Sequence, residues 1–359
     1  MNKKKSISFD KPLLVSSSPR RSGLGEYVFQ LYSLNLFSKL VLFKNDADIS
    51  EFGYDNVVKY DKNPFHIRTF QSIITNSIWS AYIKEYRHVH LSSFDYLHLS
   101  KFHPSVSVTI HDIFPLEKST RMEYSIFYRT YSKFEINAMR RVTGVVAISN
   151  FIANRIEQFC HGAEISVIHN WTDERFKKRD PVEVRKFLGL PQDKKIILNV
   201  STDEKRKNTA ILPKIMEALS NDYLLIKIGG NPNLWDNSSN NRIIFRNNLP
   251  ESIYPFYFNA SDAYLATSTE EGFGRPLIEA LVSQIPVISS DIEVFREVLF
   301  SIGNFCAPND LNCWIGSIKS ISDEKEDIIK KYKKIESHYR PERAVKEYSD
   351  FFKKLGAIR

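Results

Sequence analysis

Residues 268–286 read S-T-E-E-G-F-G-R-P-L-I-E-A-L-V-S-Q-I-P, and this stretch organises the rest of the chain. Gly272 and Gly274 flank Phe273, and glycine lets a backbone turn sharply and approach a ligand closely. Proline is favoured at the first position of a helix, and apolar residues recur at helical spacing after Pro276. The stretch therefore predicts a loop that turns into a helix near Pro276.

The start of this predicted helix suits an anion. The first N–H groups of a helix have no partner within it and favour negative charge, best a phosphate. Glu271 comes just before the turn, and Glu279 follows about one turn into the helix. Amides for phosphates, with carboxylates for sugar hydroxyls beside them, indicate a sugar nucleotide. Spacing alone leaves open an ordinary loop–helix junction with exposed glutamates.

The same stretch resembles a known family. Glu271 and Glu279, with seven residues between them in E-G-F-G-R-P-L-I-E-A, are similar to the E-x7-E signature of the retaining glycosyltransferase family 4, or glycosyl transferases group 1. The similarity continues through P-V-I-S-S-D-I-E-V-F-R-E-V (286–298) and A-P-N-D (307–310). The resemblance implies an α/β fold of the GT-B type, with two facing Rossmann-like domains that contain parallel sheets.

Length and patterning also favour two domains. The chain has 359 residues, 42% of them hydrophobic, and short apolar runs alternate with helical patterns in both halves. We expect an N-terminal, acceptor-side domain over residues 1–172 and a C-terminal domain that binds the nucleotide sugar over residues 173–341. The resemblance implies that the last helix, within residues 342–359, crosses back to the first domain.

A short apolar run near the N-terminus leads into a glycine-containing turn and then a helical pattern. Strand, glycine turn and helix together suit a phosphate, although a lone G-x-G motif is weak evidence. Gly23 and Gly25 are similar in position to the family's first loop, with Ser22 where that loop has its first glycine. The resemblance implies that both glycines lie against the donor phosphate and the acceptor.

His111 and Asp112 follow a predicted strand at residues 106–110. Ligands of open α/β sheets bind beyond the carboxyl ends of the strands, and a neighbouring carboxylate can hold a histidine in one tautomer. A His–Asp pair that merely caps a loop explains the residues as well. The resemblance implies instead that His111 lines the donor sugar.

Arg206, Lys207 and Asn208 stand between a predicted strand at 195–200 and a helical pattern. Two cations at such a turn suit a diphosphate, because arginine offers a planar fork and lysine a point charge. Consecutive polar residues are more often simply solvated. The family has R-K-N or a close variant here, and the resemblance implies that the lysine contacts the donor phosphates.

The resemblance assigns three catalytic residues, which are His111, Glu271 and Lys207. Glu271 and His111 are expected at the donor sugar and Glu279 at the ribose. The expected donor-binding residues are Gly23, Gly25, Arg206, Lys207, Gly272, Phe273, Gly274 and Glu279.

We expect no metal and no cofactor beyond the nucleotide-sugar co-substrate. Asp46-Ala47-Asp48 has the D-x-D pattern that can hold a divalent ion against a diphosphate, but it lies in a polar stretch that we interpret as a surface loop. Three cysteines without metal-ligand spacing are interpreted as reduced thiols in a cytoplasmic protein.

The expected function is a retaining, metal-independent transfer of a hexose from a UDP- or GDP-sugar to a glycan acceptor. A sugar-nucleotide epimerase or a phosphorylase on the same scaffold is an alternative. A nucleic-acid-binding protein, suggested by the basic charge and the aromatic residues, is another, but no reader motif is present and we expect no nucleic-acid partner. A third is an inactive carbohydrate-binding homologue, against which Lys207, Glu271 and Glu279 argue.

The charge is uneven along the chain. Of the net +8, residues 1–172 contribute +6, from 21 Lys/Arg and 15 Asp/Glu, and residues 173–359 contribute +2. Basic residues mixed with aromatics can lie at an anionic headgroup surface, although a solvated surface with a modest excess explains the same count. We expect no signal peptide and no membrane span. The acceptor is expected to be a lipid-linked oligosaccharide or surface polysaccharide, reached reversibly at the inner face of the membrane.

Overall fold

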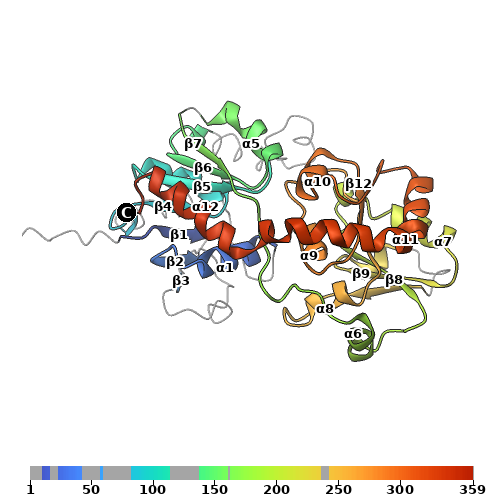
Figure 1. The fold of residues 1–359 in the computed structure, drawn as a ribbon. Helices are drawn as coiled ribbons and strands as arrows, with labels where there is room; N and C mark the ends of the chain where they lie inside the picture. The colour runs from blue at the N-terminus through green and yellow to red at the C-terminus, as the bar shows by residue number, and fades with distance from the viewer. Residues whose placement is uncertain are drawn as a thin grey trace, which may run out of the picture. The chain divides into compact units, whose positions relative to one another are not determined.

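The computed structural model describes residues 10–16, 23–42, 57–59, 82–113, 137–160, 162–235 and 242–358. Asp46 and Asp48, and with them the D-x-D pattern, lie outside these ranges. The chain divides into two compact units. Unit 1 combines Met1–Asn170 with Pro341–Arg359, and unit 2 is Trp171–Arg340 (Figure 1).

Unit 1 is built on a parallel sheet whose seven strands have the order β3-β2-β1-β4-β5-β6-β7. Most strands are short apolar runs buried on both faces, as parallel strands covered by helices must be. In the middle of the sheet, Val15 pairs with Val41 on one side and with Leu91 on the other. The strands are β1 (Leu13–Ser16), β2 (Lys39–Leu42), β3 (Val57–Lys59), β4 (Val89–Leu91), β5 (Val106–Ile110), β6 (Gly144–Ala147) and β7 (Glu164–Val167).

A local capping signal marks the start of helix α5 in unit 1. The hydroxyl of Ser149 accepts a hydrogen bond from the Ile152 amide at 3.2 Å and caps the start of α5. The helices described in this unit are α1 (Gly23–Ser33), η2 (Phe94–Lys101), α5 (Asn150–Ile156), η3 (Glu157–Phe159) and α12 (Pro341–Lys354).

The C-terminal helix α12 belongs to unit 1, although unit 2 precedes it in the sequence. It lies across the strands of unit 1 (Figure 1), with the rings of Tyr348 and Phe352 buried. Phe352 packs edge-on against Phe37 at 5.5 Å between ring centroids. A Cβ on Gly144 would lie 2.7 Å from a methyl carbon of Leu355 and 2.8 Å from the Phe351 ring, so a larger residue at this point of β6 would force these side chains to shift. The predicted return of the last helix is confirmed.

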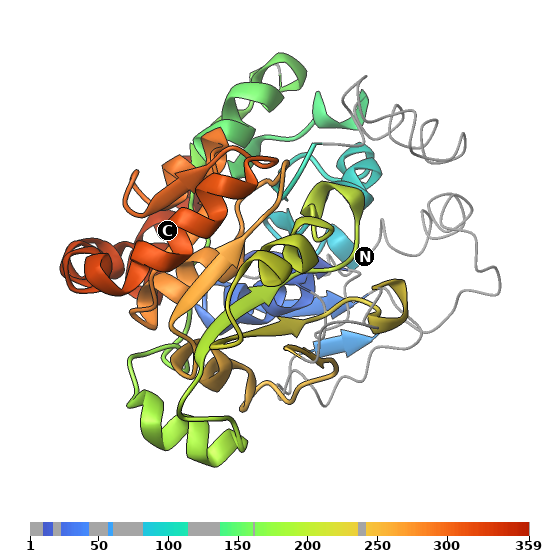
Figure 2. The same cartoon turned by 90° about the vertical axis from the view of Figure 1, so that its right-hand side faces the viewer.

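Unit 2 is built on a second parallel sheet, whose six strands have the order β10-β9-β8-β11-β12-β13. Figure 2 shows these strands in yellow-green to orange. The predicted parallel α/β pattern of both halves is confirmed. The strands are β8 (Lys195–Val200), β9 (Tyr223–Ile228), β10 (Ile243–Arg246), β11 (Ala263–Ala266), β12 (Val287–Ser290) and β13 (Asn304–Cys306).

The helices of unit 2 also follow sequence signals. Helix α6 starts with Pro181 after the capping carboxylate of Asp180 and ends at Gly189, which has a φ of 64°. The helices described here are α6 (Pro181–Leu188), η4 (Lys205–Lys207), α7 (Ile211–Ala218), η5 (Pro232–Leu234), α8 (Tyr254–Asn259), α9 (Arg275–Val282), α10 (Glu293–Val298), α11 (Leu311–Ile335) and η6 (Glu336–Tyr339).

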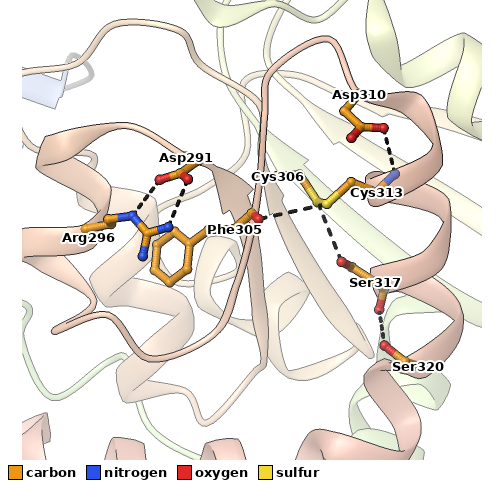
Figure 3. The surroundings of a disulfide bond; sticks show 8 residues. All are labelled: Asp291, Arg296, Phe305, Cys306, Asp310, Cys313, Ser317 and Ser320. Atoms are coloured by element: carbon orange, nitrogen blue, oxygen red, sulfur yellow. Dashed lines mark hydrogen bonds and ion pairs between the residues drawn. A yellow bond between two sulfur atoms is a disulfide. The ribbon is translucent and has the colours of Figure 1, made fainter.

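The expectation of three reduced cysteines is wrong for two of them. Cys306 and Cys313 form a disulfide (Figure 3), with their Cα atoms 5.6 Å apart. Cys160 is a buried thiol. Cys306 ends β13, and Cys313 lies in the first turn of α11, whose capping residue Asp310 accepts the Cys313 amide at 3.0 Å. The short strand-to-helix turn brings the two sulfur atoms together. An odd number of cysteines gave no indication of this pairing. The count therefore no longer supports a reducing compartment.

Candidate active site

A cationic turn follows the carboxyl end of β8 in unit 2. Arg206 and Lys207 lie in the short helix η4, which ends at Asn208 with a φ of 48°. Asparagine tolerates this left-handed conformation better than most residues, because its short polar side chain can bond locally. The side-chain amide of Asn208 donates through Nδ2 to the backbone carbonyl of Pro308 at 3.0 Å. Pro308 lies in the loop that the disulfide closes.

Backbone hydrogen bonds join the cationic turn to the segment before α9. The carbonyl of Arg206 accepts the Thr269 amide at 2.7 Å, and the carbonyl of Lys207 accepts the Thr267 hydroxyl at 2.8 Å. These bonds place a residue motif from the start of unit 2 beside one some 60 residues later. The E-x7-E stretch and the R-K-N motif therefore form one site.

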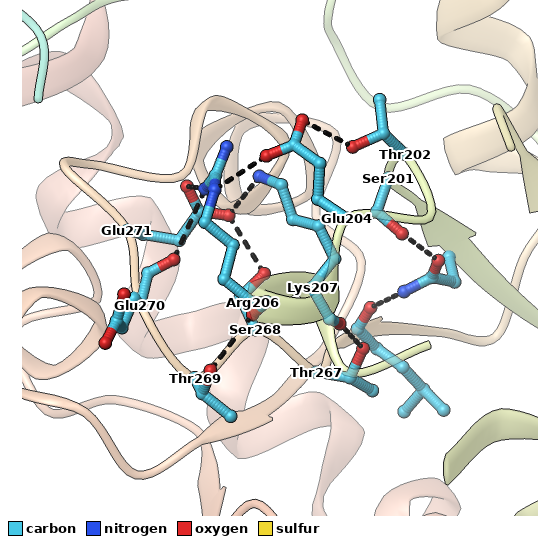
Figure 4. Close-up of polar contacts among 12 residues, drawn as sticks. Ser201, Thr202, Glu204, Arg206, Lys207, Thr267, Ser268, Thr269, Glu270 and Glu271 are labelled. Carbon is cyan, nitrogen blue, oxygen red and sulfur yellow. Dashed lines mark hydrogen bonds and ion pairs between the residues drawn. The ribbon is translucent and has the colours of Figure 1, made fainter. Parts of the chain in front are cut away.

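Glu271 lies between the two cations (Figure 4). One carboxylate oxygen is 2.5 Å from the Lys207 ammonium and the other is 3.1 Å from the Arg206 guanidinium. The Ser268 hydroxyl adds a bond at 2.9 Å, and the Glu204 carboxylate binds the Arg206 Nε at 2.8 Å. Burial raises the pKa of the Glu204 carboxyl, but Arg206, the Thr202 hydroxyl and Lys207 together outweigh burial, so that the pKa is lowered.

Helix α9 begins at Arg275, one residue before the predicted Pro276. Gly274 precedes it with a φ of 91°, and a Cβ there would lie 2.8 Å from the Phe295 ring. Glycine is thus required at this position by backbone conformation and by space. Phe273 is buried, and no side chain caps the helix start. The turn combines a sharp bend with a helix start that no side chain caps, an arrangement that suits an anion.

Glu279 is buried one turn into α9, at 5% exposure. Tyr254 of α8 donates its hydroxyl to the Glu279 carboxylate at 2.7 Å. Burial, with the charge of Glu279 added, raises the pKa of Tyr254 well above its ordinary value, so this tyrosine remains a donor. Sequence reasoning missed Tyr254, because nothing local marks a tyrosine 25 residues upstream as a partner.

In unit 1, His111 lies just beyond the carboxyl end of β5. Its Nε2 is 2.9 Å from the carbonyl oxygen of Ser92. Because a carbonyl only accepts, Nε2 carries the proton and Nδ1 of the neutral ring is an acceptor. Tyr27 of α1 packs edge-on against the imidazole, with the ring centroids 4.4 Å apart. The ring of His111 is therefore set in orientation and tautomer by its neighbours.

The placement expected for Gly23 and Gly25 needs correction. Helix α1 already begins at Gly23, so both glycines lie in its first turn and not in the turn before it. Gly25 is buried, and a Cβ on Gly23 would meet no atom within 4 Å. Ser22 lies outside the described residues. The edge-on contact of the Tyr27 ring with His111 brings the first turns of α1 and the end of β5 to the same edge of unit 1.

Below this edge, two buried histidines are held by strand hydroxyls. The Oγ of Ser107 is 2.7 Å from His88 Nε2 and 2.7 Å from His90 Nδ1, and Thr109 lies 3.0 Å from the other nitrogen of His90. Burial lowers the pKa of His88 to about 3 and that of His90 well below its ordinary value. Both rings are therefore neutral. Among the described residues no group of three metal-ligating side chains occurs.

Two family models match the chain. The model for glycosyltransferase family 4 matches residues 50–176, and the model for glycosyl transferases group 1 matches residues 182–340. The group 1 match contains Arg206, Lys207, Glu271 and Glu279, so the whole polar cluster of unit 2 lies within it. The comparisons do not favour an epimerase, a phosphorylase or a nucleic-acid-binding protein.

Curated relatives cover part of the chain. The O-antigen chain mannosyltransferase RfbU of Salmonella typhimurium is 25% identical over 243 residues, 65% of this chain and 65% of its own length. The lipopolysaccharide core biosynthesis mannosyltransferase LpsB of Rhizobium meliloti is 25% identical over 213 residues, 54% of this chain and 59% of its own. The match thus spans less than two thirds of either relative.

Solved structures extend over nearly the whole chain. HepE of Anabaena, in complex with UDP and glucose, superposes with a TM-score of 0.79 at 16% identity, covering 95% of this chain and 99% of its own. WaaG, a glycosyltransferase involved in lipopolysaccharide biosynthesis, gives 0.73 at 13% identity, covering 93% and 98%. These likenesses show the fold, which is GT-B. With both family models matched in sequence, the chain belongs to the family 4 glycosyltransferases, also described as glycosyl transferases group 1.

Proposed function

We propose that the protein is a retaining glycosyltransferase that moves a hexose from a UDP- or GDP-sugar to a glycan acceptor. The observation that carries the proposal is the contact of Arg206 and Lys207 with Glu271 beside the uncapped start of α9. Two cations beside a helix start that no side chain caps suit a diphosphate, and the family match covers the same residues.

The chemistry follows from charge. When the donor breaks, the diphosphate gains negative charge and the sugar becomes oxocarbenium-like, so donors and cations aimed at the diphosphate lower the barrier. Arg206 and Lys207 supply the cations, and the amides at the start of α9 add partial positive charge. Glu271, held in place by both cations, orients a donor sugar hydroxyl with its remaining lone pairs.

Two further residues complete the proposed assignments. Glu279, which the Tyr254 hydroxyl holds in place near the start of α9, is assigned to the ribose hydroxyls. His111 meets the donor sugar through its Nδ1, because Nε2 already donates to Ser92. Neither role requires a change of protonation during the reaction.

A titration series tests the donor proposal. Calorimetry with UDP-, GDP- and ADP-sugars should show binding of at least one of them, with UDP or GDP preferred. The names of the relatives point to mannose transfer and those of the solved structures to UDP-sugars, so both sugars belong in the series. Binding by wild type and none by Glu279→Ala would support the assigned ribose contact. No binding to any of these donors by wild type would refute the function.

Retention and metal independence are tested on the product. Retention predicts that proton NMR of the first product shows the donor's own anomeric configuration. Metal independence predicts that EDTA leaves the rate unchanged. An inverted product, or a rate that EDTA abolishes and manganese restores, would contradict the respective part of the proposal.

The acceptor is proposed to be a lipid-linked oligosaccharide or a surface polysaccharide, reached from the cytoplasm where nucleotide sugars are made. The relatives include a phosphatidyl-myo-inositol mannosyltransferase of Mycobacterium tuberculosis, which names a lipid acceptor. No helix among the described residues is long and apolar enough to cross a membrane. Flotation with anionic liposomes should carry the protein upward at low salt, since each basic residue contributes about 1 kcal/mol at such a surface. Protein that stays at the bottom and glycosylates only soluble acceptors would overturn this.

A further inference from the structure

A lysine is buried in the sheet of unit 2. Lys227, the fifth residue of β9, has no exposed surface. Its ammonium donates to three backbone carbonyls, those of Ser201, Ile228 and Gly229, the last two at 3.3 and 3.0 Å. These carbonyls stand where β8 and β9 end. The carboxyl ends of parallel strands are the edge at which α/β sheets bind ligands.

The charge of Lys227 has no direct counter-charge within the described part of the chain. No carboxylate there forms an ion pair with it, and Asp203 acts on it only from a distance. A buried cation without an ionic partner is costly, so its retention calls for a reason beyond packing.

The ammonium lies at a joint between two loops. Gly229 has a φ of 82°, and a Cβ there would lie 2.7 Å from the Ser201 carbonyl oxygen. Gly230 approaches so closely that its Cβ would lie 2.6 Å from the carboxylate of Asp203. That carboxylate in turn accepts the Asn231 amide and, at 3.4 Å, the indole N–H of Trp235. The loops after β8 and β9 are thus held together by Asp203 from one side and by Lys227 from within.

The loop after β8 leads directly into the cationic turn. Glu204 at its end binds the Arg206 guanidinium at 2.8 Å, and η4 begins at the next residue. We propose that Lys227 is a positioning residue of the donor site, whose protonated side chain fixes the β8 loop and through it the cations that meet the diphosphate. This inference rests on the proposed function.

Protonation decides whether the joint is complete. An ammonium has three N–H donors, enough for three carbonyls, whereas a neutral amine has two and leaves one carbonyl without a partner. Burial lowers the pKa of Lys227 to about 8, Asp203 raises it, and Lys207 lowers it further. At one pH unit above that pKa only about a tenth of the lysine is charged. Nucleotide affinity should therefore fall above pH 8.

Calorimetry with UDP and with GDP, titrated separately at pH 7 and pH 9, tests this in the full chain. For the nucleotide that binds, wild type should lose about tenfold in affinity between the two values. Lys227→Met should bind about tenfold more weakly at pH 7 and show no further loss. Lys227→Arg, which keeps its charge at both values, should restore a pH-independent affinity. Lys214→Met, an exposed lysine of α7, should behave as wild type. Equal affinities for wild type and Lys227→Met would overturn the inference.

Hydrogen exchange without nucleotide separates this inference from the proposed function. At one fixed pH, the amides of residues 201–208 should exchange faster in Lys227→Met than in wild type, and no faster in Lys214→Met. Faster exchange supports the joint even if neither nucleotide binds, a result that would count against the donor and not against Lys227. Unchanged exchange in Lys227→Met overturns the positioning role.

Discussion

Both units bury basic side chains in a parallel sheet, but His88 and His90 of unit 1 are neutral, whereas Lys227 of unit 2, with a pKa of about 8, is mostly charged at neutral pH. His88 and His90 bond to Ser107 and other strand hydroxyls. Lys227 bonds, within the described part of the chain, to backbone carbonyls. Both kinds of side chain lie in the core, so burial alone does not separate them.

The difference follows from the partners. A hydroxyl can donate or accept, so it satisfies both nitrogens of a neutral imidazole. A carbonyl only accepts, and three of them together require the three donors of an ammonium. His88, His90 and the hydroxyls that bond to them, here called the histidine ladder, thus stabilise the interior of unit 1 without a charge. Lys227 instead places a cation at an edge of the sheet where ligands bind. Buried polarity serves packing in one sheet and, by our inference, donor binding in the other.

The largest expected effect is on the pH dependence of stability. For basic groups with a lowered pKa the unfolded state binds more protons, so stability rises with pH between the folded and unfolded values. His88 gives such a rise between about 3 and 6.5, and Lys227 between about 8 and 10.5. Each window is worth on the order of 3–5 kcal/mol. Denaturant unfolding across pH should show the lower window reduced in His88→Gln and the upper one absent in Lys227→Met. If the free energy of unfolding of either variant differed from that of wild type by the same amount at every pH, the prediction would be contradicted.

Removing the hydroxyl between the two histidines tests the ladder of unit 1. Ser107→Ala leaves one nitrogen of His88 and one of His90 without a partner, which should lower the free energy of unfolding by about 2–4 kcal/mol. Nucleotide affinity should not change. Ser33→Ala, at an exposed position of α1, should stay within about 0.5 kcal/mol of wild type. A loss of affinity without a loss of stability would reverse the assignment of the ladder to packing.

Opening the disulfide tests whether the cationic turn of unit 2 depends on the loop that the disulfide closes. Cys313→Ser opens a loop of eight residues and should lower the free energy of unfolding by about 2.5 kcal/mol. Because Asn208 bonds to Pro308 in that loop, nucleotide affinity should fall as well. Wild type kept in a dithiol reductant is the matched comparison and should show both changes. Identical stability with and without the reductant would show that the loop is closed by other contacts.

Removing one cation of the site separates function from stability. Lys207→Ala should lower turnover tenfold or more with saturating donor, since a charge-assisted contact to a leaving diphosphate contributes about 1.5–3 kcal/mol. The fold should persist, because Lys207 is partly exposed and its backbone bonds remain. Lys214→Ala serves as the surface control. Wild-type kinetics in Lys207→Ala would exclude the assigned role.

The smallest effect is expected at the end of α9. Gln284 stands in the left-handed region with a φ of 59°, and its Oε1 is buried with no hydrogen-bond partner among the described residues. Gln284→Gly should relieve both costs and raise the free energy of unfolding by about 1 kcal/mol, part of the gain being offset by the flexibility of glycine. Thermal unfolding measures the change. A lower melting temperature of Gln284→Gly would mean that side-chain contacts of the glutamine stabilise the protein by more than its backbone conformation costs.

Part of the fold and of the candidate site could be predicted from local sequence pattern. Apolar runs predicted the strands β5 and β8 at residues 106–110 and 195–200, and Gly274 with Pro276 marked the start of α9, because turn and helix signals act within a few residues. The return of the last helix to unit 1 was implied by the family resemblance and not by local pattern. Glycine positions near α1 were less informative: Gly23 reads as a turn residue, yet α1 starts there.

The sequence by itself determined the α/β class, the parallel sheets and the residue types of the polar cluster, since periodicity, turn chemistry and motif spacing are local. Only the tertiary structure decided which residues meet. The Lys207–Glu271 pair, the Tyr254–Glu279 bond and the cysteine pairing join residues whose side chains carry no mark of their partners. The same holds for Lys227. Its sequence context is that of an ordinary strand residue, and only the folded structure brings the carbonyls at the ends of β8 and β9 around its ammonium. Partners and burial, which set protonation, arise only when distant segments pack.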